Sequence, residues 1–210
     1  YKILYTDFVG GTYNPFDYVK TPASKEIEPW TEAQIAQHES LGDHFIRLLV
    51  SVLLNTGQRL SDITEIRAQQ LVGSTNDPIC FVQKKTGNIV HVPVTQELIG
   101  VARPILLTVV RDYDNLWKHL LNTKEYITEN LLRYQYMRRC DARGIEPLRL
   151  HGLRKNAVLR MINAGATEFE VMAITGHKST SSLRHYTTGY NTGAAGAAAI
   201  RKLEAYTNGK

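Results

Sequence analysis

The sequence has 210 residues, of which 43% are hydrophobic and 21% charged, the composition of an ordinary globular protein with enough chain to bury a core. It carries 25 lysine and arginine residues against 20 aspartate and glutamate residues, and the resulting net charge of +5 is compatible with a polyanionic partner such as nucleic acid. No apolar run reaches the roughly 20 residues of a membrane span, and two cysteines in unrelated contexts, Cys80 and Cys140, indicate neither a disulfide framework nor a zinc site.

The first 29 residues have the character of a linker. Glycine and proline residues interrupt them, and no hydrophobic periodicity is sustained. The chain begins with Tyr1 rather than methionine and shows no basic stretch followed by an apolar run. We therefore expect a fragment of a longer protein without a signal peptide. The sparse cysteines favour a reducing, cytoplasmic location.

Three helices are expected in the next segment. Thr31 is a suitable N-cap for a helix over residues 31–38. Residues 45–54 are strongly apolar and predict a buried helix, which the following Asn-Thr-Gly sequence should end. A third helix is expected from about residue 61 to residue 68, where isoleucine and alanine recur at helical spacing.

Two strands follow these helices. Residues 78–85 and 88–94 are rich in strand-forming residue types, and Thr-Gly-Asn at residues 86–88 predicts a tight hairpin between them. A third strand is expected near residues 71–73. The fold class predicted from these elements is mainly α, with a small three-stranded antiparallel β-sheet.

The second half of the sequence is predicted to be helical from residue 96 onward. Residues 128–143 alternate apolar and basic side chains at helical spacing, and Gly144 is expected to cap that helix. Further helices are predicted over residues 153–163, 168–175, 179–186 and 194–206.

The densest group of reactive side chains lies in the last third of the chain. His151 and Arg154, in HGLR, are three residues apart and can share one face at a helix start. Such a pair suits a phosphodiester, because arginine binds two oxygens while histidine moves a proton. His177 follows Gly176 in GHKS, and Tyr186 comes nine residues later. Each residue by itself also has an ordinary structural explanation, such as a salt-bridged arginine, a helix-end histidine or a core tyrosine.

Two further cations precede this group. Arg59, in TGQRLSD, stands at a loop-to-helix junction, where helix N-termini favour anions. An ion pair with Asp62 or Glu65 is the structural alternative. Lys85, in KKTG, lies near the tip of the predicted hairpin, where a solvated turn lysine would be unremarkable.

These five motifs occur in the order typical of the tyrosine recombinases, the phage-integrase family of site-specific DNA recombinases, which this sequence resembles. The resemblance extends from about Trp30 to Glu204 and covers the family's catalytic domain. It implies the mainly helical catalytic-core fold. Residues 29–210 would form the catalytic domain with a C-terminal tail helix, and residues 1–28 the end of a core-binding domain and the inter-domain linker.

The resemblance also implies catalytic roles for three cations. Arg59 and Arg154 match the two family arginines and would hold the non-bridging oxygens of the scissile phosphate. Lys85 matches the hairpin lysine, which would protonate the departing 5′ oxygen. Lys84 is the weaker candidate, because Lys85 directly precedes the Thr-Gly turn.

The remaining roles concern the nucleophile and two histidines. Tyr186 matches the family nucleophile, His151 would act as general acid or base toward it, and His177 would hydrogen-bond the phosphate. Tyr190 competes for the role of nucleophile, but its spacing from His177 does not match the family. We expect His185, beside Tyr186, to be structural.

The reaction implied by the resemblance is strand exchange through a 3′-phosphotyrosyl intermediate, with neither a metal nor another cofactor. Double-stranded DNA would be the substrate, bound by four copies of the chain, and the fragment alone would be monomeric. Accessory DNA-bending or directionality proteins are compatible with this activity, whereas no membrane partner is expected. Integration or excision of a phage or another mobile element is the favoured role. A type IB topoisomerase and a non-catalytic DNA-binding relative are the alternatives.

The alanine-rich tail, residues 192–205, has two possible docking sites. By analogy with the family it would contact a neighbouring copy on DNA, and otherwise it would pack on its own domain. Deletion of the residues after Thr192 is expected to weaken synapsis or regulation more than DNA binding.

Overall fold

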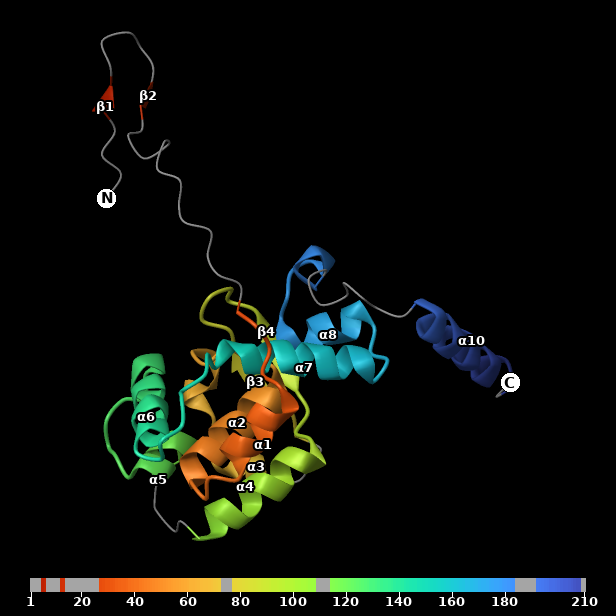
Figure 1. Ribbon diagram of the computed structural model, residues 1–210. Helices are drawn as coiled ribbons and strands as arrows, with labels where there is room; N and C mark the ends of the chain where they lie inside the picture. Colours follow the sequence, from red (N-terminus) through yellow and green to blue (C-terminus); the bar gives the residue numbers. More distant parts are fainter. Residues whose placement is uncertain are drawn as a thin grey trace.

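Helix α2 (His44–Thr56) is the centre of the fold. The computed structural model describes residues 5–6, 12–13, 27–72, 77–108, 114–183 and 192–208. Nearly every side chain of α2 is buried, as expected for a helix that is apolar around most of its circumference. The helices that pack around it are α1 (Glu32–Glu39), α4 (Gln96–Thr108), α5 (Leu116–Leu121), α6 (Glu129–Asp141) and α7 (His151–Asn163) (Figure 1).

Smaller elements complete the fold. Helix α8 (Glu168–Thr175) packs against α7 and against strand β4 (Ile89–Val92), so it lies between α7 and the sheet (Figure 1). A single 3-10 turn, η2 (Thr180–Leu183), follows it, and helix α10 (Thr192–Asn208) ends the described chain. Near the N-terminus, the two-residue strands β1 (Tyr5–Thr6) and β2 (Thr12–Tyr13) pair antiparallel.

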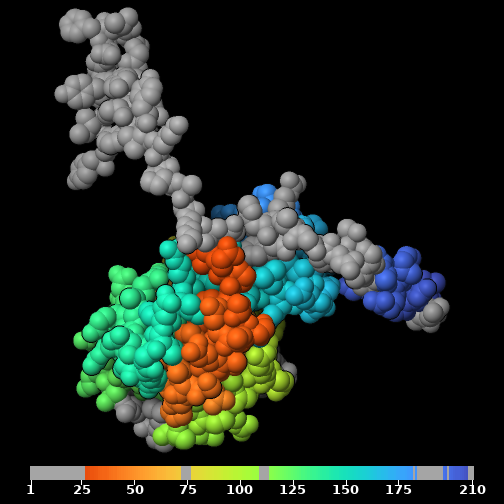
Figure 2. Space-filling model, viewed as in Figure 1, coloured from red at the N-terminus to blue at the C-terminus, as the bar shows by residue number. Residues whose placement is uncertain are grey.

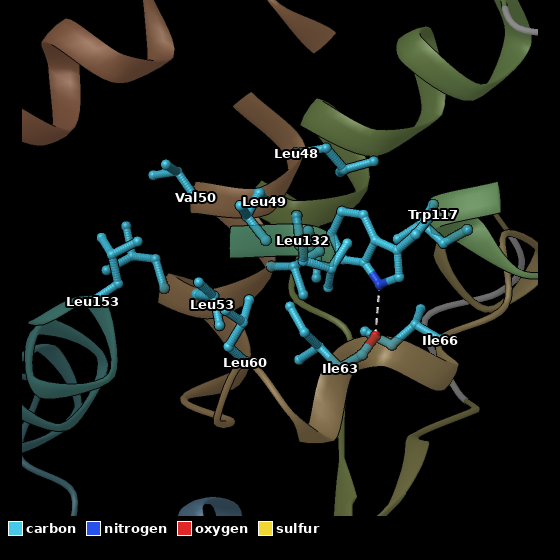
Figure 3. Packing of buried hydrophobic residues seen from close by; sticks show 14 of the residues in the cluster. Leu48, Leu49, Val50, Leu53, Leu60, Ile63, Ile66, Trp117, Leu132 and Leu153 are labelled. Atoms are coloured by element: carbon cyan, nitrogen blue, oxygen red, sulfur yellow. Dashed lines mark hydrogen bonds between the residues drawn. The ribbon is translucent and has the colours of Figure 1, made fainter. Parts of the chain in front are cut away.

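The core fills the space between α2 and its neighbours with interlocking aliphatic and aromatic side chains, and Figure 3 shows the part of it around Trp117. Trp117, from α5, is fully buried, and its indole Nε1 donates a 2.6 Å hydrogen bond to the carbonyl oxygen of Ile63. A buried indole N–H needs such a partner, because an unpaired donor would oppose folding. The core thereby holds the segment that follows α2, where Arg59 lies.

The expected hairpin is present. Strands β3 (Ile79–Val82) and β4 (Ile89–Val92) pair antiparallel, with Val82 opposite Ile89. Their side chains alternate between buried and exposed positions, so one face packs on the core and the other faces outward. Gly87 completes the turn with a φ of 68°, in the left-handed region that favours glycine.

The predicted third strand near residues 71–73 is wrong. Residues Gln69–Val72 form the short helix α3, which packs on α4, and β3 and β4 form a two-stranded sheet. The side chain of Leu71 is fully buried. An apolar residue such as Leu71 is expected to be buried in either element, so a short apolar segment does not distinguish a strand from a helical turn.

The helix predicted over residues 61–68 is also shorter than expected. Only a 3-10 turn, η1 (Asp62–Glu65), forms there. Beyond it, Ile66 turns to an extended ψ of 134° and its carbonyl oxygen accepts from the backbone N–H of Leu116. A tertiary hydrogen bond thus replaces the next helical one.

Most other helix boundaries agree with the sequence prediction. Thr31 caps α1 through a capping box with Gln34, and Thr128 caps α6. Helix α10 lies at the side of the main body (Figure 2), where Lys202 Nζ is 3.2 Å from the carbonyl oxygen of Gly165. No helix within the described ranges is both long and apolar enough to cross a membrane.

Candidate active site

The N-terminal turn of α7 supplies two of the predicted residues. Arg154 is only 2% exposed. Its Nη1 donates to the carbonyl oxygen of Gly57 at 2.6 Å, and its Nη2 donates to that of Thr175 at 2.8 Å. The guanidinium therefore joins the loop after α2 to the C-terminal end of α8. His151, one turn earlier, lies exposed at the surface.

Arg59 reaches the same place from the loop that follows α2. Gly57 ends α2 in the left-handed conformation, with a φ of 62°, and turns the chain toward Arg59. The Arg59 Nη1 atom lies 3.5 Å from Asp62 Oδ2 and 3.4 Å from Gln83 Oε1. Asp62 was the predicted structural partner of Arg59, and its other carboxylate oxygen accepts from the backbone N–H of Lys84 at 2.9 Å. One buried carboxylate thus orients both the arginine and the hairpin.

Two fully buried glutamines connect the motifs beneath the arginines. Gln83 Nε2 donates at 2.8 Å both to Gln58 Oε1 and to the carbonyl oxygen of Thr175. Gln58 Nε2 donates to the carbonyl oxygen of Ile174 at 2.7 Å. The sequence interpretation missed both residues. The sequence did hold an indication for Gln83, because this residue continues the alternating inward-facing positions of β3. A polar side chain at such a position needs a buried hydrogen-bond partner.

His177 stands just beyond the end of α8. Gly176 ends that helix with a φ of 69°, and a Cβ atom there would collide with the side-chain amide of Gln83. Glycine is therefore required both by conformation and by space. His177 Nδ1 lies 2.6 Å from Thr175 Oγ1, and His177 Nε2 lies 3.4 Å from Arg154 Nη2.

The two histidines share one positive field. Burial, together with the charges of Arg154 and Arg59, lowers the pKa of His177 to about 4. The pKa of His151 is also lowered. The main cause is desolvation of the part of the ring that the protein covers, and nearby cations that include Lys85 add to it. Both imidazoles are therefore neutral near pH 7, while the arginines stay charged. The site is cationic and suited to an anion.

The hairpin separates the two candidate lysines. Lys84 Nζ donates to Thr64 Oγ1 at 2.8 Å and lies 3.7 Å from Glu65, so this side chain is directed to η1. Lys85 is exposed, and its charge contributes to the lowered pKa of His151. Of the two lysines, Lys85 is the one whose charge acts on His151.

Tyr186, the predicted nucleophile, lies outside the described residues, as do His185 and Tyr190. The chain is described up to Leu183, which is fully buried against Val158 and other residues of α7 and α8. The structure therefore brings together five of the six predicted residues, from Arg59 to His177, and does not place the sixth.

A hollow of about 310 Å³ adjoins these residues. Arg59 and His151 form part of its wall, and Arg133 of α6 and Arg149 add further positive charge. Arg133 is paired with Glu129, which also lines the hollow. This surface extends the cationic site toward α6.

The segment that precedes α1 is hydrogen-bonded directly to helix α7. Trp30 N donates to Asn156 Oδ1 at 2.7 Å, and Asn156 Nδ2 donates to the carbonyl oxygen of Trp30 at 2.7 Å. A Cβ atom on Gly152 would lie 2.6 Å from both the carbonyl oxygen of Glu28 and the Trp30 ring. The glycine of HGLR thus permits this segment to pass beside His151.

The Phage integrase family profile matches residues 31–192. Among the solved structures that the chain resembles is a Tn1549 transposon integrase in complex with transposon right end DNA, which aligns with 91% of this chain at 18% identity and a TM-score of 0.62. XerA recombinase also aligns with 91% of this chain, at 19% identity and a TM-score of 0.58. A lambda integrase tetramer bound to a Holliday junction covers 81%, at 20% identity and a TM-score of 0.54.

The chain spans 72% of the Tn1549 structure, 66% of XerA and 53% of this lambda integrase chain. It therefore aligns with between about half and three quarters of the length of these solved chains. No protein of curated function matches the sequence.

Proposed function

Because this chain belongs to the phage integrase family, we propose that it is the catalytic part of a site-specific DNA recombinase that cuts and rejoins DNA strands. The observation that carries the proposal is the meeting of Arg59, Arg154 and His177 around one cationic site, next to His151. These residues come from three distant segments of the chain. Their shared field is suited to the phosphate of a DNA backbone.

In the proposed reaction, the two arginines bind the non-bridging oxygens of the scissile phosphate. Negative charge on these oxygens grows as a nucleophile adds to phosphorus. Guanidinium groups already held in place by Gly57, Thr175 and Asp62 stabilise that charge without reorganisation. His177 adds a hydrogen bond to the same phosphate.

Tyr186 is the proposed nucleophile. Its hydroxyl oxygen attacks phosphorus and gives up its proton toward His151, while the bond from phosphorus to the 5′ oxygen breaks and Lys85 protonates that oxygen. The lowered pKa of His151 supports this role, because a neutral imidazole can accept a proton. The 3′-phosphotyrosyl bond conserves the phosphodiester, so a 5′ hydroxyl of another strand reverses the step.

The proposal extends to the organisation of the protein. We infer that residues 29–210 are the catalytic domain and that residues 1–28 are the end of a core-binding domain and a linker. The attachment of Glu28 and Trp30 to α7 supports a linker that enters beside the site. Double-stranded DNA is the proposed partner, with four copies on the DNA and accessory proteins to set direction. Integration or excision of a phage or mobile element in the cytoplasm is the proposed role.

A covalent-trapping experiment tests the function. The full-length protein would be mixed with nicked duplexes of randomised core sequence, in which cleavage releases a short 5′-ended piece that diffuses away. We expect a covalent protein–DNA adduct that resists denaturant. Tyr186→Phe should abolish the adduct, while Tyr190→Phe should retain it, because only Tyr186 has the family spacing from His177.

Three outcomes would contradict the proposal. An adduct that persists in Tyr186→Phe would assign the nucleophile elsewhere. DNA binding without any adduct, across the randomised pool, would indicate a non-catalytic relative. Relaxation of supercoiled plasmid without site preference would instead support a type IB topoisomerase.

A further inference from the structure

Thr175 joins the two halves of the site through different atoms. Its backbone carbonyl oxygen accepts from Arg154 Nη2 and from Gln83 Nε2, both at 2.8 Å. Its side-chain oxygen lies 2.6 Å from His177 Nδ1 and 2.6 Å from the carbonyl oxygen of Val171. The side chain is fully buried, so no water competes for these contacts.

The direction of these hydrogen bonds decides where the His177 proton lies. The Thr175 hydroxyl has one hydrogen, and the Val171 carbonyl can only accept it. The hydroxyl oxygen must then accept from His177 Nδ1, which therefore carries a hydrogen. At the other side of the ring, Arg154 Nη2 is only a donor, and it faces His177 Nε2 at 3.4 Å. Both contacts favour a neutral imidazole that is protonated on Nδ1 and bare on Nε2.

We propose that Thr175 is a positioning residue that fixes this tautomer, so that His177 must take up a proton before it can donate a hydrogen bond from Nε2 to a bound phosphate. The inference rests on the proposed function and deepens it, because it specifies the protonation state in which the site binds phosphate. Proton uptake from solvent then accompanies binding, and one imidazole N–H forms on Nε2.

The charges around His177 explain why this uptake awaits the ligand. Arg154 and His151 act on it from α7 and Arg59 from the loop after α2, and its pKa is lowered to about 4. The groups that face it from the hairpin and the end of α8, Gln83 and Thr175, do not titrate. A bound anion offsets the arginine charges and raises the pKa of His177, because an opposite charge favours the imidazolium.

The proton taken up by His177 makes the affinity for the anion depend on pH in one direction. His177 is neutral in the free chain above about pH 4, and protonated in the complex until the pH exceeds its raised pKa. Between these two pKa values each bound anion carries one extra proton. The affinity therefore falls by up to about tenfold for each unit of rising pH, and the dependence ends above the pKa of the complex.

Nitrogen NMR of the imidazole rings tests the tautomer directly, on the full chain with sulfate as the probe, since sulfate does not itself titrate near neutral pH. His177→Gln identifies the His177 signals and thereby separates them from those of His151. At pH 7 we expect a protonated Nδ1 and a bare Nε2 in the free chain. Saturating sulfate should protonate both nitrogens. A free ring protonated on Nε2, or a ring that stays neutral with sulfate bound, would overturn the inference.

Thr175→Val and Thr175→Ser form a matched pair. Valine keeps the branched shape and the backbone carbonyl but loses the hydroxyl, whereas serine keeps the hydroxyl. We expect Thr175→Val to lose the Nδ1-protonated tautomer and to bind sulfate with a weaker dependence of affinity on pH. Thr175→Ser should restore both properties. Equal tautomer populations in wild type and Thr175→Val would contradict the inference. If the valine variant does not fold, a wild-type free ring protonated on Nε2 would still overturn it, and the serine variant should keep the wild-type tautomer.

The result is separable from the proposed function. The tautomer and the sulfate titration require no DNA cleavage. A covalent adduct together with an Nε2-protonated ring would reject only the role of Thr175. The predicted tautomer without any adduct would reject only the recombinase activity.

Discussion

Two parts of the candidate active site are built in opposite ways. The floor consists of Arg154, Thr175 and the glutamines Gln58 and Gln83, all buried and linked by hydrogen bonds to the core helices. The rim consists of Lys85 and His151, both exposed. Groups that hold a phosphate need fixed positions, and burial supplies them. Groups that exchange protons need access to the reacting strand, and exposure supplies that.

The comparison is tested most severely by Arg154→Lys. One ammonium nitrogen cannot bridge the carbonyl oxygens of Gly57 and Thr175 as the guanidinium does. We expect adduct formation to fall by about 10³-fold and the free energy of unfolding to fall by about 3 kcal/mol. Single-turnover cleavage and denaturant unfolding measure these losses.

Arg160→Lys is the matched control for that change. Arg160 lies on the same helix, is 40% exposed, and pairs at the surface with Glu32 and Glu97. Surface ion pairs contribute little, so both measurements should stay near wild type. Equal losses in the two variants would mean that the floor has no special role.

The rim is tested by Lys85→Ala, with a smaller expected effect. Loss of a general acid lowers the rate of cleavage by about 10²-fold or more, while the melting temperature should not change, because the side chain is exposed. Lys84→Ala is the control, since Lys84 is bound to Thr64 and Glu65. A larger loss of cleavage in Lys84→Ala would transfer the proton-donor role to that residue.

Gln83→Leu is expected to have the smallest effect on cleavage, and it sharpens the description of the floor. The change leaves the buried amide of Gln58 and the carbonyl of Thr175 without one partner each. We expect a loss of about 1–3 kcal/mol in unfolding free energy and roughly a tenfold slower cleavage, because Arg59 loses an acceptor. Gln37→Leu, at an exposed position of α1, should change stability by less than about 0.5 kcal/mol.

Sequence reasoning succeeded where the signal was local. The N-cap at Thr31, the buried helix α2 and the glycine turn at residue 87 each follow from neighbouring residues. It failed near Leu71, where residues 71–73 were predicted to form a strand although Leu71 lies in the short helix α3. The choice between the two depended on packing against α4, which adjacent residues do not encode.

The residues of the site also fall into those that local sequence motifs indicate and those that only tertiary packing brings together. The order and spacing of the motifs identify Arg59, Lys85, His151, Arg154 and His177 as candidates without any coordinates. The motifs contain no indication that Gln58 and Gln83 would pair beneath them, because the two are 25 residues apart and meet only when the hairpin folds against α8.

Residue types and spacing in the chain are therefore sufficient to indicate the family, the mainly helical fold and the chemistry to be expected, since each depends on short-range pattern. Folding decided which lysine directs its charge at His151, why Gly152 and Gly176 leave no room for a side chain, and which groups face the two nitrogens of His177. Those properties depend on distances between segments far apart in sequence. Hydrogen-bond direction and desolvation exist only once these segments are packed together.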